Sequence, residues 1–194
     1  MKRKRKVEMG QQSSVLSRTL NECLSYLLKQ QVRFIIYSYP LESEINVFVD
    51  QPSHAVKSYV LNSFNTINSE ELNGQVFSLD NWELIKEFQL DSSIIKEERP
   101  REQHYMVQQE YESYVQGIQD EIEAGNLVKC VAARKKRVPL PNGFVLVDAF
   151  AKILMNHKSA YCYLAHCNSG TWMGASPEVL VHNNGEKSYT VALA

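Results

Sequence analysis

The chain has 194 residues, of which 44% are hydrophobic and 22% are charged, the composition of a globular protein with a sizeable core. Its 21 basic and 22 acidic residues give a formal net charge of -1, so the overall charge gives no reason to expect a nucleic acid or an anionic membrane as a partner. No apolar run approaches the roughly 18 residues of a transmembrane helix, and polar residues rather than the apolar stretch of a secretory signal follow the basic start. These features predict a cytoplasmic protein.

The first hundred residues are predicted to form an α/β portion behind a short tail. Residues 1–12 begin with a run of lysine and arginine, for which a disordered, solvated tail is favoured over a functional basic arm. Residues 13–103 form the predicted N-terminal α/β portion. Within it, leucines at three- and four-residue spacing predict an amphipathic helix over 13–31, and apolar, β-rich runs predict strands over 32–39 and 45–49.

Residues 104–194 are predicted to form a second portion, which follows a polar and charged surface connection. The apolar patterns predict helices over 105–124 and 144–156, and strands over 128–138, 160–167 and 172–175. A hairpin is expected around the turn Asn183-Asn184-Gly185. Helices mixed with strands that are joined by short turns indicate an α+β fold, a layered α/β/α sandwich with a largely antiparallel sheet.

The four cysteines are predicted to be reduced and structural. Cys23 lies on the helical pattern, Cys130 and Cys162 lie in apolar runs, and Cys167 follows Cys162 at a spacing that does not resemble a zinc site. A redox or metal role is the less favoured alternative.

Lys129 is a candidate general base because it lies within the apolar, strand-like run over 127–134. Burial among apolar neighbours would disfavour the charged ammonium, and a neutral amine can accept a proton from water. The alternative is that Lys129 lies on the solvent face of an edge strand, which the residues alone do not exclude.

Glu178 is a candidate general acid because it follows a predicted strand and a turn of small residues. Pro177 restricts the backbone before it, and Gly174 to Ser176 leave room for a ligand beside the chain. A partly buried carboxyl group can keep its proton and donate it to a departing hydroxyl. The alternative is a glutamate in the first turn of a helix behind a Ser-Pro cap.

Two segments resemble the chorismate-utilising enzymes. Gly125–Arg134 (GNLVKCVAAR) resembles the family's G-x-x-x-K-V-V-x-x-R run, and Trp172–Leu180 (WMGASPEVL) resembles its F-x-G-A-S-P-E-x-L run. The closing Thr190–Ala194 (TVALA) resembles the start of its A-L-A-G-T motif. The order and separation of the segments also fit, and the resemblance covers about residues 105–194.

The resemblance implies an activity and a role for each matching residue. A lysine at the position of Lys129 activates the water that attacks C2 of chorismate, and a glutamate at the position of Glu178 protonates the departing C4 hydroxyl. Ser176 and Ala194 fall at substrate-binding positions. The family also uses a magnesium ion, which binds the ring carboxylate of the substrate. The implied reaction adds and removes water without a redox change.

The same resemblance distinguishes branches of the family. Ammonia-using members carry glutamine where Lys129 stands, and P-I-A-G-T or P-I-K-G-T where the closing residues stand. Lysine with A-L-A resembles the water-using branch. Isochorismate synthase, feeding menaquinone or a siderophore, is the first expectation, and salicylate synthase, which also eliminates pyruvate, is the second.

The length of the chain departs from the family, whose members are about twice as long or more. The resemblance therefore implies that the chain forms half of the chorismate-binding fold, with the magnesium ligands beyond Ala194. We expect such an N-terminal part to be inactive alone, because catalysis needs the groups that position the substrate. It could also self-associate through exposed strand edges. A non-catalytic binding module or a remnant of the family is the alternative of a different class.

Overall fold

A computed structural model describes residues 2–62, 69–88, 90, 105–177, 181–183 and 185–190, with the backbone alone described for residues 2–13, 62 and 182. The chain divides into two units, which are described separately. One unit combines residues 1–98 with residues 145–194, and the other consists of residues 99–144.

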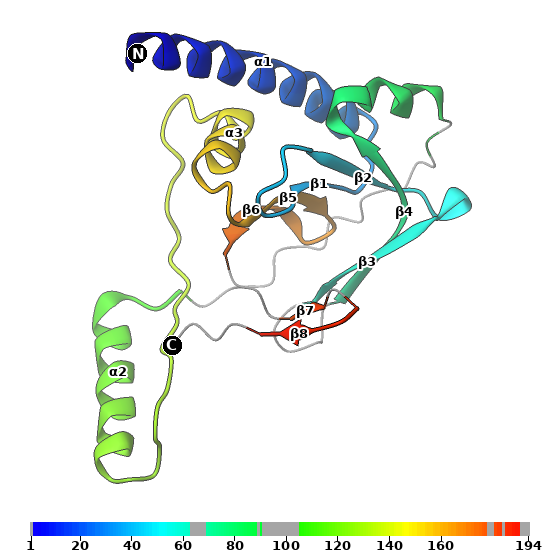
Figure 1. Cartoon of the computed structure of the whole chain (residues 1–194). Helices are drawn as coiled ribbons and strands as arrows, with labels where there is room; N and C mark the ends of the chain where they lie inside the picture. The colour runs from blue at the N-terminus through cyan, green and yellow to red at the C-terminus, as the bar shows by residue number, and fades with distance from the viewer. Residues whose placement is uncertain are drawn as a thin grey trace. The chain divides into compact units, whose positions relative to one another are not determined.

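The first unit begins with the long helix α1 (Lys2–Lys29), drawn in blue in Figure 1. Its apolar face is buried as the leucine spacing predicts: Leu20, Cys23 and Leu27 are almost fully inaccessible. The prediction of a disordered tail over 1–12 is wrong for the described backbone, because α1 already begins at Lys2. Lysine, arginine, glutamine and methionine are good helix formers, and no proline interrupts them.

A six-stranded antiparallel sheet forms the centre of this unit. Its strands are β1 (Phe34–Ser38), β2 (Asn46–Asp50), β3 (Lys57–Asn62), β4 (Ser69–Ser78), β5 (Tyr161–Cys167) and β6 (Gly170–Ser176), in the spatial order β3-β4-β2-β1-β5-β6. Gly74 in β4 lies so close to β2 that a Cβ atom there would collide with the carbonyl oxygen of Val49. A two-stranded hairpin of β7 (His182–Asn183) and β8 (Ser188–Tyr189) follows, at the predicted turn.

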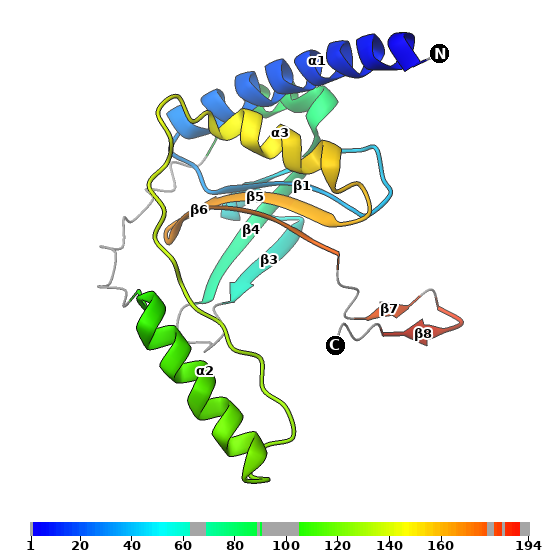
Figure 2. The same ribbon diagram turned by 90° about the vertical axis from the view of Figure 1, so that its left-hand side faces the viewer.

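The helices of this unit cover one face of the sheet (Figure 2). Phe34 and Ile36 of β1 point into a core shared with α1, with the 3-10 helix η2 (Leu79–Glu87) and with α3 (Leu146–Asn156). Because successive side chains on a strand point to opposite faces, Ile35 and Tyr37 lie on the other face. That second face is rich in aromatic side chains. A short 3-10 helix, η1 (Pro52–His54), follows β2.

The sheet joins segments from both predicted portions, 13–103 and 104–194. β5 pairs with β1 along its length, with Phe34 opposite His166 and Ser38 opposite Cys162. The predicted boundary near residue 103 therefore differs from the observed division, in which residues 99–144 form a unit between two halves of one sheet. Strand pairing between distant segments is what local patterns do not reveal.

The second unit contains the helix α2 (Gln108–Glu123) and the extended segment 127–141. The helix is close to its predicted bounds. The backbone N–H of Val107 donates to Glu110 Oε2 at 3.0 Å at its start, and Gly125 adopts a positive φ of 77° after its end. Arg134 lies over the ring of Tyr111, with 5.2 Å from Cζ to the ring centroid.

The predicted strand over 128–138 is wrong, because the segment has no strand partner in the described residues. Val128 is 95% exposed and Val131 is 89% exposed. A strand needs a neighbour to satisfy its backbone groups, and an apolar run alone does not provide one. The α+β class and the antiparallel sheet are otherwise confirmed.

Candidate functional site

The motif strand β6 carries Ser176, the one predicted site residue of the first unit that lies within the described residues. β6 pairs with β5 so that Ser176 lies opposite Tyr161 and Gly174 opposite Tyr163. Ser176 is half-buried at the end of the strand, and Pro177 after it is exposed. Glu178 and Ala194, the predicted acid and the second predicted substrate-binding residue, lie outside the described residues.

Five tyrosines gather on the face of the sheet opposite the helices, and we call them the tyrosine face: Tyr37, Tyr39, Tyr59, Tyr161 and Tyr163. Tyr59 donates its hydroxyl hydrogen to the hydroxyl oxygen of Tyr37 at 2.7 Å. Ring centroids are 5.9 Å apart for Tyr37 and Tyr161, and 6.2 Å apart for Tyr161 and Tyr163. Since Ser176 lies opposite Tyr161, it shares this face.

The hydroxyls of Tyr37, Tyr59 and Tyr161 remain protonated at neutral pH. Burial raises the pKa of Tyr37. Burial also raises the pKa of Tyr59 and of Tyr161. Neutral phenols can donate hydrogen bonds to a carboxylate, but they do not act as phenolate bases.

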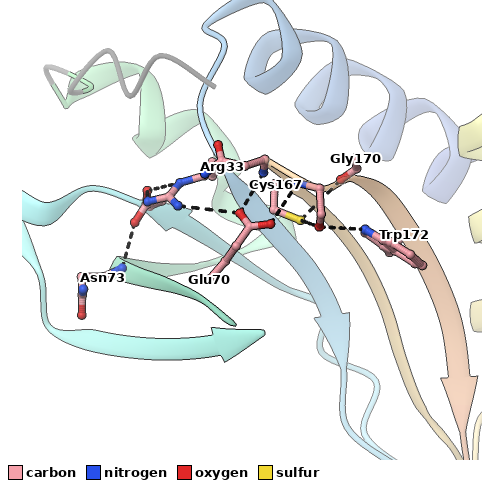
Figure 3. Close-up of polar contacts among 9 residues, drawn as sticks. Arg33, Glu70, Asn73, Cys167, Gly170 and Trp172 are labelled. Atoms are coloured by element: carbon pink, nitrogen blue, oxygen red, sulfur yellow. Dashed lines mark hydrogen bonds and ion pairs between the residues drawn. The ribbon is translucent and has the colours of Figure 1, made fainter. Parts of the chain in front are cut away.

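A group of charged residues, Arg33, Asp50 and Glu70, joins β1, β2 and β4 at one end of the sheet, and we call it the Arg33 clamp (Figure 3). Arg33 Nη2 lies 2.6 Å from Asp50 Oδ2, and Arg33 Nη1 lies 3.9 Å from Glu70 Oε2. The Asp50 side chain is fully buried and also accepts the backbone N–H of Asn73 at 2.8 Å. A buried carboxylate is stable only when it is paired in this way.

The Arg33 clamp reaches the beginning of the motif strand through Glu70. The two carboxylate oxygens of Glu70 accept the backbone N–H groups of Asn168 and Ser169, at 2.8 and 2.9 Å, in the turn between β5 and β6. Ser169 Oγ in turn accepts the indole N–H of Trp172 at 3.2 Å, as Figure 3 shows. The turn that leads into β6 is therefore fixed by contacts from β4.

Lys129, the predicted base, belongs to the second unit. Its side chain is exposed, and it belongs to the extended segment rather than to a strand. The prediction that Lys129 is embedded in a buried strand is therefore wrong for this structure.

The described residues hold no set of metal ligands. Within the described ranges no group of three histidine, cysteine, aspartate or glutamate side chains is arranged to hold a metal ion. A magnesium site is thus not fitted by these residues. No helix in the described part of the chain has the length and apolar character needed to cross a membrane.

Three of the four cysteines are buried, and only Cys130 is exposed. Burial raises the pKa of the Cys23 thiol to about 12 and also raises the pKa of Cys162 and of Cys167. The reactive thiolate is therefore scarce at these three positions at pH 8, whereas Cys130 is accessible.

We expect Ellman's reagent at pH 8 to modify one thiol rapidly in the native chain and four in denaturant. The Cys130→Ser variant should lose the rapid reaction. Because Cys130 follows Lys129, the same measurement reports whether that segment is open to solvent. Rapid reaction at two or more sites would contradict the described burial.

Sequence reasoning missed both the tyrosine face and the Arg33 clamp. The tyrosines had a usable signal, because Tyr37 and Tyr39, like Tyr161 and Tyr163, are two residues apart, which places each pair on one face of a strand. The sequence contains no such signal for the Arg33 clamp. Glu70 and Asn168 are 98 residues apart, and their contact depends on the topology of the sheet.

A helix-covered antiparallel sheet whose last strand, β6, carries Gly174-Ala175-Ser176 is the class of domain that the two motif segments predicted. The family model for chorismate-binding enzymes matches residues 51–194, well over half of the chain. The chain belongs to the family of chorismate-binding enzymes. No curated protein and no solved structure matches it.

Proposed function

We propose that this protein acts as an isochorismate synthase, which converts chorismate to isochorismate. The family match carries the proposal, because its range of residues 51–194 includes both segments that resemble the family motifs. Lysine rather than glutamine at position 129, followed by the closing Ala192-Leu193-Ala194, supports the water-using branch.

The proposed reaction is balanced by two proton transfers, one from the water that attacks C2 and one to the hydroxyl that leaves C4. The amine of Lys129 takes a proton from water as the water oxygen forms a bond to C2 of chorismate. The ring double bonds shift and the bond between C4 and its oxygen breaks. The carboxyl group of Glu178 gives its proton to that oxygen, which leaves as water, so one water enters and one leaves.

The described residues support parts of this scheme. The Arg33 clamp and the pairing with β5 hold β6 in place before Ser176 and Pro177. The half-buried Tyr161, opposite Ser176 on the same face, could donate a hydrogen bond to a carboxylate of chorismate. Lys129 is exposed in the structure, so the proposal requires that the extended segment becomes covered when the base works.

Magnesium remains a prediction from the resemblance. In the family the ion neutralises a substrate carboxylate, a form of electrostatic stabilisation. The described residues do not form its site, and no step above depends on it.

The test is product analysis with the full product of the gene that encodes this chain. Incubation with chorismate and magnesium should yield isochorismate, separated by liquid chromatography, without pyruvate. Salicylate with an equal amount of pyruvate would favour the salicylate synthase alternative. Binding of chorismate without turnover would favour a non-catalytic module. Assay of the 194-residue chain beside it tests the prediction that these residues alone are inactive.

A further inference from the structure

Gly174, in the middle of the motif strand, faces an aromatic ring across the β5–β6 pair. Its cross-strand partner is Tyr163 of β5. A Cβ atom added at Gly174 would lie 3.2 Å from both Cε1 and Oη of Tyr163 and 3.3 Å from Cζ. The ring of Tyr163 therefore lies directly over the backbone of Gly174. Space for this ring, rather than a positive φ, is what requires glycine at this position.

Tyr163 is not free to move away from the motif strand. Its ring stacks on Tyr161, with an interplanar angle of 25°. Tyr161 in turn contacts Tyr37, which is almost fully buried and hydrogen-bonded to Tyr59. A side chain that pushed Tyr163 from the side of β6 would meet resistance from this row of rings, because packed interiors do not yield easily.

The motif strand depends on such contacts because it is the last strand in the order of the sheet. β6 pairs with β5 on one side and has no described strand on its other side. The Arg33 clamp holds the turn before it, at Asn168 and Ser169. Tyr163 contacts it two residues before Ser176, where the clamp does not reach.

We propose that Tyr163 is a positioning residue for the chorismate site, which fixes the path of β6 by its contact with Gly174. The ring sets how closely β6 approaches the tyrosine face and hence where Ser176 and Pro177 are directed. The inference rests on the proposed function, because it assigns Tyr163 a role in the same site. Tyr163 takes no part in the chemistry itself.

The experiment is a double-mutant cycle between Gly174→Ala and Tyr163→Val, made in the full gene product and followed by kcat and KM for isochorismate formation. Gly174→Ala alone should lower kcat by about 10- to 100-fold with a small change in KM, because a displaced end of β6 misaligns the reacting groups. In the Tyr163→Val background, where the ring is gone, the same glycine substitution should cost little more. Tyr163→Phe keeps the ring and should retain nearly full activity.

The outcomes separate this inference from the proposed function. Equal losses from Gly174→Ala in both backgrounds would overturn the role of the ring, even if isochorismate forms normally. Coupling seen only in thermal unfolding of the same variants, with kcat and KM unchanged, would make the contact purely structural and would also overturn the proposal. Absence of any chorismate turnover in the wild type would defeat the proposed function and this inference with it.

Discussion

Replacing Lys129 by Ala should abolish most isochorismate formation. A positioned general base contributes on the order of 10²- to 10⁴-fold to a rate, and we expect kcat to fall within that range. Lys129→Gln should be equally inactive, because an amide cannot accept a proton from water. The loss should appear mainly in kcat, since the amine acts as the water attacks and not when chorismate binds.

Lys135 provides the matched control for that experiment. It lies on the same extended segment and is also exposed, so Lys135→Ala removes an equal charge from the same unit. Its activity should stay close to that of the wild type. Comparable losses in both variants would indicate an effect of charge or of segment structure. Normal turnover in Lys129→Ala would remove this lysine from the mechanism.

The second large effect is expected at the Arg33 clamp. Arg33→Met keeps the apolar stem of the side chain and removes its charge, which leaves the fully buried Asp50 carboxylate without its ion partner. Removing one member of a buried ion pair costs about 3–5 kcal/mol, and we expect the free energy of unfolding to fall by about 3 kcal/mol because Asn73 still donates to Asp50. Urea unfolding followed by circular dichroism measures this change.

Two further variants show whether the unpaired carboxylate of Asp50 causes the loss of stability. The double variant Arg33→Met with Asp50→Asn should regain part of the lost stability, since it leaves no unpaired carboxylate. Arg18→Met breaks the ion pair between Arg18 and Glu22, whose side chains are 82% and 48% exposed, and should cost less than about 0.5 kcal/mol. Equal effects at Arg33 and Arg18 would show that burial of Asp50 does not matter.

The elements predicted best from sequence are those whose burial is set by their own periodicity. The helices α1 and α3 each bury one apolar face against the sheet, and β1 and β5 are runs of β-rich residues. The extended segment over 128–138 has the same apolar character as these strands, yet it is not a strand. Its backbone hydrogen bonds require a neighbouring strand, which a local pattern cannot specify.

The order of the candidate site residues along the chain could be predicted from the sequence, but their arrangement in space could not. The motif residues before Ser176 form a strand as expected, and the family match agrees with the two motif segments. The tyrosine face and the Arg33 clamp depend on which strands are neighbours, and Arg33, Asp50 and Glu70 come from three different strands or their flanks. Lys129 was expected to be buried because a strand was predicted over 128–138, and that strand is not formed.

Along the chain, residues 99–144 separate the strands that form one sheet, and this separation has a consequence for synthesis of the protein. Phe34 pairs with His166, about 130 residues later, which at ~5–20 residues per second emerges roughly 7 to 26 s after it. During that interval one edge of β1 is unpaired, and the apolar residues of α1 lack the residues of α3 that later pack against them. The nascent protein therefore passes through a period in which another chain or a chaperone can compete with β5 for that edge.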